Sequence, residues 1–161
     1  MIMALTKKDI LVFAHWQGFN EPRHMGTLTA TPARGKETFA FEYTPAWLKS
    51  GFSQMLDPDL QLYSGAYYPR IDKSTFGVFL DSCPDRWGRI LMQRREAVLA
   101  KKENRTPKKL LKSDFLLGVF DGHRMGALRF KTEEEGPFLN DQKELASPPW
   151  TALAELEQAS L

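Results

Sequence analysis

The stretch "KETFAFEY", residues 36–43, alternates apolar and polar side chains with a period of two. Phe39, Phe41 and Tyr43 fall on one face, as expected of a β-strand with one buried side. Residues 25–31, "MGTLTAT", alternate in the same way, and residues 9–16, "DILVFAHW", are β-rich and largely apolar. Gly, Asn and Pro occupy the links between these stretches, which is typical of hairpin connections. The sequence therefore predicts a three-stranded antiparallel meander.

Helical patterns dominate the chain after this meander. Thr44, Pro45 and Gly51 fit the cap, the first position and the end of a short helix. We expect further helices and one returning strand in this order: helices near 74–81, 84–102, 107–111 and 113–120, a strand at 126–131, and a last helix from about Pro148. The predicted fold class is α+β: a small antiparallel sheet or partly open barrel, then a helical subdomain and a returning strand. The expected division is 1–72, 73–131 and 132–161, the last an acidic loop and helix.

Composition narrows the class of protein. The chain has 161 residues, 42% of them hydrophobic and 26% charged, with a net charge of +2, which lies in the ordinary globular range. No apolar run reaches the roughly 20 residues needed to cross a membrane, and the charged start does not look like a signal peptide. The single cysteine, Cys83, cannot form an internal disulfide. A cytoplasmic location without membrane contact is the resulting expectation.

Charge is unevenly distributed along the sequence. Residues 86–112 hold ten Lys or Arg against two Glu, whereas residues 133–161 hold seven acids against one Lys. We favour an amphipathic, half-buried helix with a solvated basic side. Clustered cations also attract phosphates or an acidic protein, so a partner or nucleic-acid surface stays open, formed by Arg86, Arg89, Arg95 and Lys102.

Motifs for catalysis are missing from the sequence. The glycines do not form a G-x-G-x-x-G or a G-x-x-x-x-G-K-[ST] loop for phosphate. His15, His24 and His123 are far apart, which argues against a zinc site. Gly118 is expected to be a close-packing position. No catalytic, cofactor-binding or metal-binding residue is assigned in this chain.

Two stretches, taken together, resemble the N-terminal region of HipA-type serine/threonine kinase toxins. They are "FLDSCPDRWGRILMQRR", residues 79–95, and "SDFLLGVFDGHRMGALRF", residues 113–130. The preceding strands and the Trp-Leu helix fit as well, so the resemblance covers roughly residues 9–131. The matching positions are structural ones, namely Pro84, Asp85, Trp87, Gly88, Gly126 and Phe130. Pro84 and Asp85 are expected to start a helix, Trp87 to anchor it in the core beside Gly88, and Gly126 and Phe130 to shape a strand.

The resemblance implies a full-length protein kinase that uses Mg-ATP, acts in a bacterial toxin–antitoxin system linked to persistence, and modifies substrates such as aminoacyl-tRNA synthetases. It implies a DNA-binding, HipB-like antitoxin as partner, with DNA reached only through that antitoxin. In the family the ATP-binding and catalytic motifs come later in the chain, and this sequence ends at Leu161. The leading hypothesis is the non-catalytic N-terminal portion of such a toxin, which alone needs no cofactor. The alternatives are a stand-alone regulator that docks on and masks a separate kinase chain, and a nucleic-acid-binding protein acting through residues 86–112.

Overall fold

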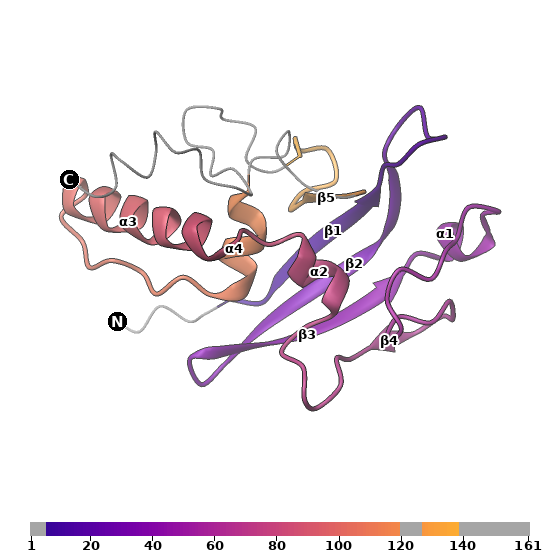
Figure 1. Ribbon diagram of the computed structural model, residues 1–161, viewed down its shortest axis with the longest axis horizontal. Coiled ribbons are helices and arrows are strands. Elements are labelled where there is room, and N and C mark those ends of the chain that lie inside the picture. Colours follow the sequence, from indigo (N-terminus) through magenta and orange to yellow (C-terminus); the bar gives the residue numbers. More distant parts are fainter. Residues whose placement is uncertain (1–5, 120–126, 139–161) are drawn as a thin grey trace.

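The computed structural model describes residues 6–119 and 127–138, and these form an α+β fold (Figure 1). The elements are β1 (Lys8–Ala14), β2 (Arg23–Ala33), β3 (Lys36–Tyr43), α1 (Pro45–Lys49), β4 (Ala66–Tyr67), α2 (Gly77–Asp81), α3 (Arg86–Lys102), α4 (Lys112–Gly118) and β5 (Leu128–Lys131). Gly126 and the helix expected from about Pro148 lie outside the described residues.

The strands form one antiparallel sheet in the order β4-β3-β2-β1-β5. The sheet is open, so the predicted α+β class is confirmed and the sheet does not close into a barrel. The predicted meander is β1, β2 and β3, in which Leu28 of β2 lies between Ile10 and Phe41. The returning strand β5 pairs with β1 and places Phe130 opposite Val12. The chain thus brings segments more than a hundred residues apart to neighbouring positions at one edge.

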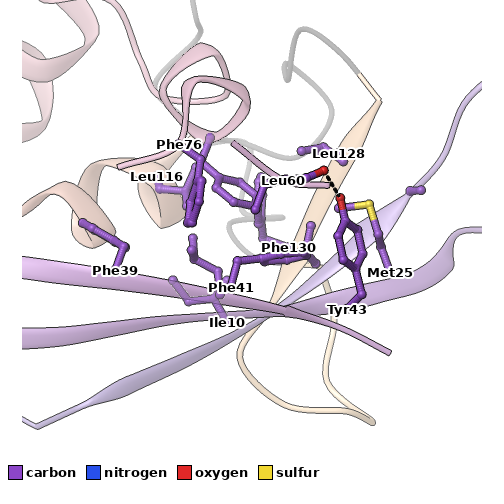
Figure 2. Packing of buried hydrophobic residues seen from close by; sticks show 14 of the residues in the cluster. Ile10, Met25, Phe39, Phe41, Tyr43, Leu60, Phe76, Leu116, Leu128 and Phe130 are labelled. Atoms are coloured by element: carbon purple, nitrogen blue, oxygen red, sulfur yellow. Dashed lines mark hydrogen bonds between the residues drawn. The ribbon is translucent and has the colours of Figure 1, made fainter. Parts of the chain in front are cut away.

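The core lies on one face of this sheet (Figure 2). Alternate residues of the strands point into it, and α1, α2 and α4 supply the side chains that cover it (Figure 1). Phe41 is fully buried, with ring centroids 4.9 Å from Tyr43 and 5.4 Å from Phe79. The hydroxyl of Tyr43 donates to the Leu60 carbonyl at 3.1 Å, and burial raises the pKa of Tyr43 to about 12. Aromatic side chains therefore fill much of the inner face, and the buried hydroxyl of Tyr43 has a hydrogen-bond partner.

Most predicted helices are present, but the helix expected at 107–111 is wrong. That segment has no regular secondary structure, and two of its amide groups donate to side chains. The Lys108 amide donates to Glu96 at 2.8 Å, and the Leu111 amide donates to Asp114 at 2.8 Å. Side-chain carboxylates therefore accept from these two amides in place of helical carbonyls, one of them 12 positions away and the other 3 positions away. Within the described residues no helix is long and apolar enough to cross a membrane.

Candidate interaction surfaces

Helix α3 is defined by clear signals at both ends. Pro84 is buried before it, and Asp85 is its N-cap, with Oδ1 accepting from the Gly88 amide at 2.7 Å. At the far end Asn104 has φ 51°, in the left-handed region, a conformation that Asn tolerates better than most residues and that commonly ends helices. The Arg105 amide then donates to the Ala100 carbonyl at 2.9 Å. The side chain of Asp85 therefore defines the start of the helix, and the left-handed backbone of Asn104 marks its end.

Trp87 is not a core anchor, contrary to the sequence-based expectation, because its side chain is 51% exposed. The buried side of α3 is formed by Gly88, Met92 and Ala100. Trp87 lies about 100° around the helix from Gly88, so burying the glycine turns the indole toward solvent. Gly118 of α4 permits this packing, since a Cβ there would come within 1.9 Å of the Met92 Cε. The close-packing role expected of Gly118 agrees with this contact.

The exposed side of α3 carries a row of residues that we call the α3 stripe: Trp87, Leu91, Arg94 and Val98. Their spacing of four, three and four residues places them along one line of the helix. Val98 is 54% exposed and Leu91 is half-buried. In Figure 1 α3 extends away from the sheet. The stripe is a partly apolar surface outside the sheet core.

The four cations proposed for a partner or nucleic-acid surface do not share one side of α3. At about 100° per residue, Arg86 and Arg89 lie about 60° apart, whereas Arg95 and Lys102 lie about 160–180° from Arg86. Arg95 is half-buried, and this burial lowers its pKa. The structure thus separates the four into two pairs, on either side of the helix. Their role in binding remains a prediction.

Glu96 links α3 to the segment that follows it. Arg105 binds both carboxylate oxygens, with its Nη2 3.2 Å from Oε2, and the Lys108 amide donates to Oε1 at 2.8 Å. The hydrogen bonds from Arg105, and then from the Lys108 amide, lower the pKa of Glu96 to about 2. Arg105 also pairs with Glu103. Arg105, one of the ten cations of the basic segment, is therefore occupied by internal ion pairs.

The Ser-Asp pair of the 113–130 motif has a structural role. Ser113 is fully buried, and its amide and hydroxyl donate to Glu37 of β3 at 2.9 and 2.6 Å. Lys8 of β1 donates to the Ser113 hydroxyl at 2.9 Å and pairs with Asp114 at 2.6 Å. Asp114 in turn accepts from the Leu111 amide at 2.8 Å. This network joins the start of α4 to two strands of the sheet.

Residues 52–71 also carry large apolar side chains that are exposed. They are Phe52, Met55, Tyr63, Tyr68 and Ile71. Asp57 within this segment is buried. Its carboxylate accepts from the Asp59 amide at 2.9 Å and from the Val78 amide at 3.0 Å, in the first turn of α2. The sequence could not reveal this anchor, because the two groups are 21 positions apart.

The outer face of the sheet is polar and shallowly hollowed. A depression of about 510 Å³ is lined by threonines of β2 and β3, together with Lys7, Asp9 and Tyr68. Thr29 donates to Asp9 at 2.9 Å across β2 and β1. In the part of the chain that the structure describes, no group of three or more His, Cys, Asp or Glu could hold a metal ion.

The remaining matched residue, Phe130, is fully buried in β5 beside the core aromatics, with its ring 6.3 Å from Phe79. Comparison with protein-family models matches residues 19–131 to the HipA N-terminal domain. No curated protein and no solved structure matches the chain.

Proposed function

Because the chain belongs to the HipA N-terminal domain family, we propose that this toxin-type domain is the non-catalytic N-terminal portion of a protein serine/threonine kinase. One observation carries the proposal: three polar residues of the two family motifs are used to build the fold. Asp85 caps α3, while Ser113 and Asp114 join α4 to the sheet. Residues consumed by such contacts support a scaffold role, so that Mg-ATP and the phosphoryl-transfer groups belong to another part of the toxin.

The proposed partner is a DNA-binding antitoxin, in the cytoplasm of a bacterium, with DNA reached through the antitoxin. Membership of the HipA family supports a toxin–antitoxin setting in general. The exposed apolar residues on 52–71 and on α3 give this domain surface suited to protein contact.

The experiment that tests the scaffold role compares two purified proteins under the same conditions. One is the 161-residue chain, and the other is the product of the whole reading frame that contains it. We expect Mg-ATP-dependent serine phosphorylation only from the longer product, provided that the frame continues into kinase motifs. Saturable Mg-ATP binding and serine labelling by the 161-residue chain would refute the proposal.

A second candidate is a stand-alone regulator that docks on a separate kinase chain and masks it. The exposed aromatic side chains on 52–71 favour it, because aromatic residues supply much of the energy of protein interfaces. A stop codon after this domain, followed by a separate kinase frame, distinguishes this candidate from the first. Co-purification of the two chains, with loss of kinase activity on mixing, is the expected result for a regulator.

A nucleic-acid role for residues 86–112 is the third candidate, and the geometry gives it the least support. The proposed cations lie on two sides of α3, and Arg105 is held by Glu96 and Glu103. Duplex binding that weakens steeply with added salt is the expected signature of such a role. Reversing the charges of Arg86, Arg89, Arg95 and Lys102 together, with no loss of duplex binding, would exclude it.

A further inference from the structure

The loop between β1 and β2 places a buried phenylalanine beside α1. Gly18 has φ 101°, and the Phe19 amide donates to the Trp16 carbonyl at 3.0 Å, so these residues form a tight turn whose third position favours glycine. The Phe19 ring stacks on Trp16, with centroids 4.9 Å apart, and makes a T-shaped contact with Trp47 of α1 at 6.3 Å. Because Trp47 is only 2% exposed, the Phe19 ring is fixed to the core.

Phe52, in the segment after α1, adds a second ring that faces solvent. Its ring makes a T-shaped contact with Phe19, with centroids 5.1 Å apart, and Phe52 is 45% exposed. Arg23, the first residue of β2, lies over both rings, with its guanidinium carbon 5.1 Å from the Phe19 centroid and 4.7 Å from the Phe52 centroid. Both distances lie within the range of cation–π attraction. We call Phe19, Phe52 and Arg23 the arginine clamp.

The guanidinium of Arg23 keeps its hydrogen-bond donors available. Arg23 is exposed, and among the described residues its side chain has no hydrogen bond and no ion pair. A guanidinium presents five N–H donors in a planar fork that matches the geometry of a carboxylate. The two rings already restrict this side chain, so less rotamer freedom is lost when an anion binds. The clamp is therefore preorganised for an anionic ligand.

A hollow of about 470 Å³ adjoins the arginine clamp, and this volume lies in the range of ligand sites. It is lined by Gly18, Asn20, Glu21, Pro22 and Arg23. Glu21 has no ion pair with Arg23, so its negative charge repels a phosphate dianion or a nucleic-acid backbone more strongly than a single carboxylate. The exposed ring of Phe52 beside Arg23 favours apolar groups next to that carboxylate.

From these observations we propose that the arginine clamp binds an aspartate or glutamate side chain of a partner protein, with an apolar residue of that partner packed on Phe52. The carboxylate accepts two N–H bonds from Arg23, and the two rings shield one side of this ion pair from water. Aromatic and arginine residues supply much of the binding energy at protein interfaces. The contact does not depend on the kinase activity proposed above.

An NMR titration of the 161-residue chain with a short peptide tests the contact. The probe is acetyl-Leu-Asp-Leu-amide, and its uncharged match is acetyl-Leu-Asn-Leu-amide. We expect the Nε–Hε resonance of Arg23 to shift saturably with the aspartate peptide, and several-fold less with the asparagine peptide. Equal shifts from the two peptides would overturn the proposal. Tighter binding of inorganic phosphate than of the aspartate peptide would overturn it as well.

Four substitutions separate the roles of the groups in the clamp. Arg23→Gln is expected to abolish the peptide-dependent shifts of the nearby backbone amides, and Phe52→Leu is expected to weaken binding several-fold. Glu21→Gln is expected to strengthen binding, because it removes the competing charge from the hollow. The matched control, Arg86→Gln, makes the same change on α3, at the other end of the sheet (Figure 1), and is expected to bind like the unaltered chain.

Backbone amide spectra of each variant report whether the fold is retained. Because Arg23 and Phe52 are exposed, we expect these spectra to match that of the unaltered chain outside the loop and the segment after α1. Peptide binding that survives Arg23→Gln, or that is lost equally in Arg86→Gln, contradicts the proposal. Unchanged affinity in Phe52→Leu means that the ring does not position the guanidinium, and this result also overturns the clamp.

Discussion

The sheet and helix α3 differ in what surrounds their apolar residues. In β1 to β3 the alternate apolar residues are buried, with Ile10, Leu28 and Phe41 fully inaccessible. In α3 the apolar residues divide, so that Met92 is buried while Trp87 and Val98 lie largely in solvent. A strand has only two faces, so alternation identifies the buried one. In α3 the apolar residues lie on several sides of the helix, so its buried side depends on where the neighbouring helix packs.

The largest loss of unfolding free energy is expected for Phe41→Ala, a substitution on the buried face of the sheet. The ring is fully buried among aromatic neighbours, and replacing such a ring by a methyl group costs roughly 3–5 kcal/mol of unfolding free energy. Urea denaturation of Phe41→Ala and of Glu42→Ala, the adjacent exposed position on β3, measures the difference. Similar losses from both variants contradict the one-sided burial of the sheet.

A smaller loss of unfolding free energy is expected for Ser113→Ala, which removes hydrogen bonds between the start of α4 and the sheet. The variant removes the hydroxyl that donates to Glu37 and accepts from Lys8. Leaving charged partners underbonded costs about 1–3 kcal/mol. The same denaturation measurement applies, with the exposed Ser74→Ala as control. A loss no greater than that of the control means that the network does not hold α4 to the sheet.

Acid titration examines the connection from α3 to the segment after it. The pKa of Glu96 is about 2 in the fold, with Arg105 as the main cause, and an unperturbed glutamate has a pKa near 4.3. A lowered pKa contributes stability that is fully present above about pH 4.3 and is lost as the pH falls toward 2. We therefore expect unfolding free energy to decline across this window, and to decline less steeply in Glu96→Gln.

The control for this titration is Glu134→Gln, because Glu134 is exposed and its side chain has no ion pair among those of the described residues. Its pH profile is expected to follow that of the unaltered chain. Identical profiles for all three proteins between pH 2 and about 4.5 would show that the Glu96 ion pair is too exposed to affect stability.

Much of the sheet could be predicted from local pattern, and less of the helical half. The alternation at Phe39, Phe41 and Tyr43 identified β3 and its buried face, because a strand's side-chain period depends only on backbone geometry. Pro84 and Asp85 were expected to start a helix, and Asp85 does so as the N-cap of α3, within one turn of the amide that it binds.

The structural features that could not be predicted depend on contacts between groups that are distant in the sequence. The buried carboxylate of Asp57 accepts from the Val78 amide, and the Lys108 amide in the irregular segment 107–111 donates to Glu96. The orientation of α3 requires Gly118, which leaves room for Met92. In the candidate surfaces, sequence identified the basic residues of α3, but not that Arg86 and Arg95 lie on different sides. The exposed aromatics of 52–71 carried no periodic signal in the sequence.

The smallest effect is expected from Trp87→Ala, although tryptophan is the largest side chain. Half of its surface is already in solvent, and exposed substitutions usually change unfolding free energy by less than about 0.5–1 kcal/mol. Denaturation of Trp87→Ala beside Phe41→Ala tests the contrast between α3 and the sheet within one experiment. A loss for Trp87→Ala as large as that for Phe41→Ala would mean that α3 packs its tryptophan face inward. In that case the α3 stripe is core, and it cannot serve as a docking surface.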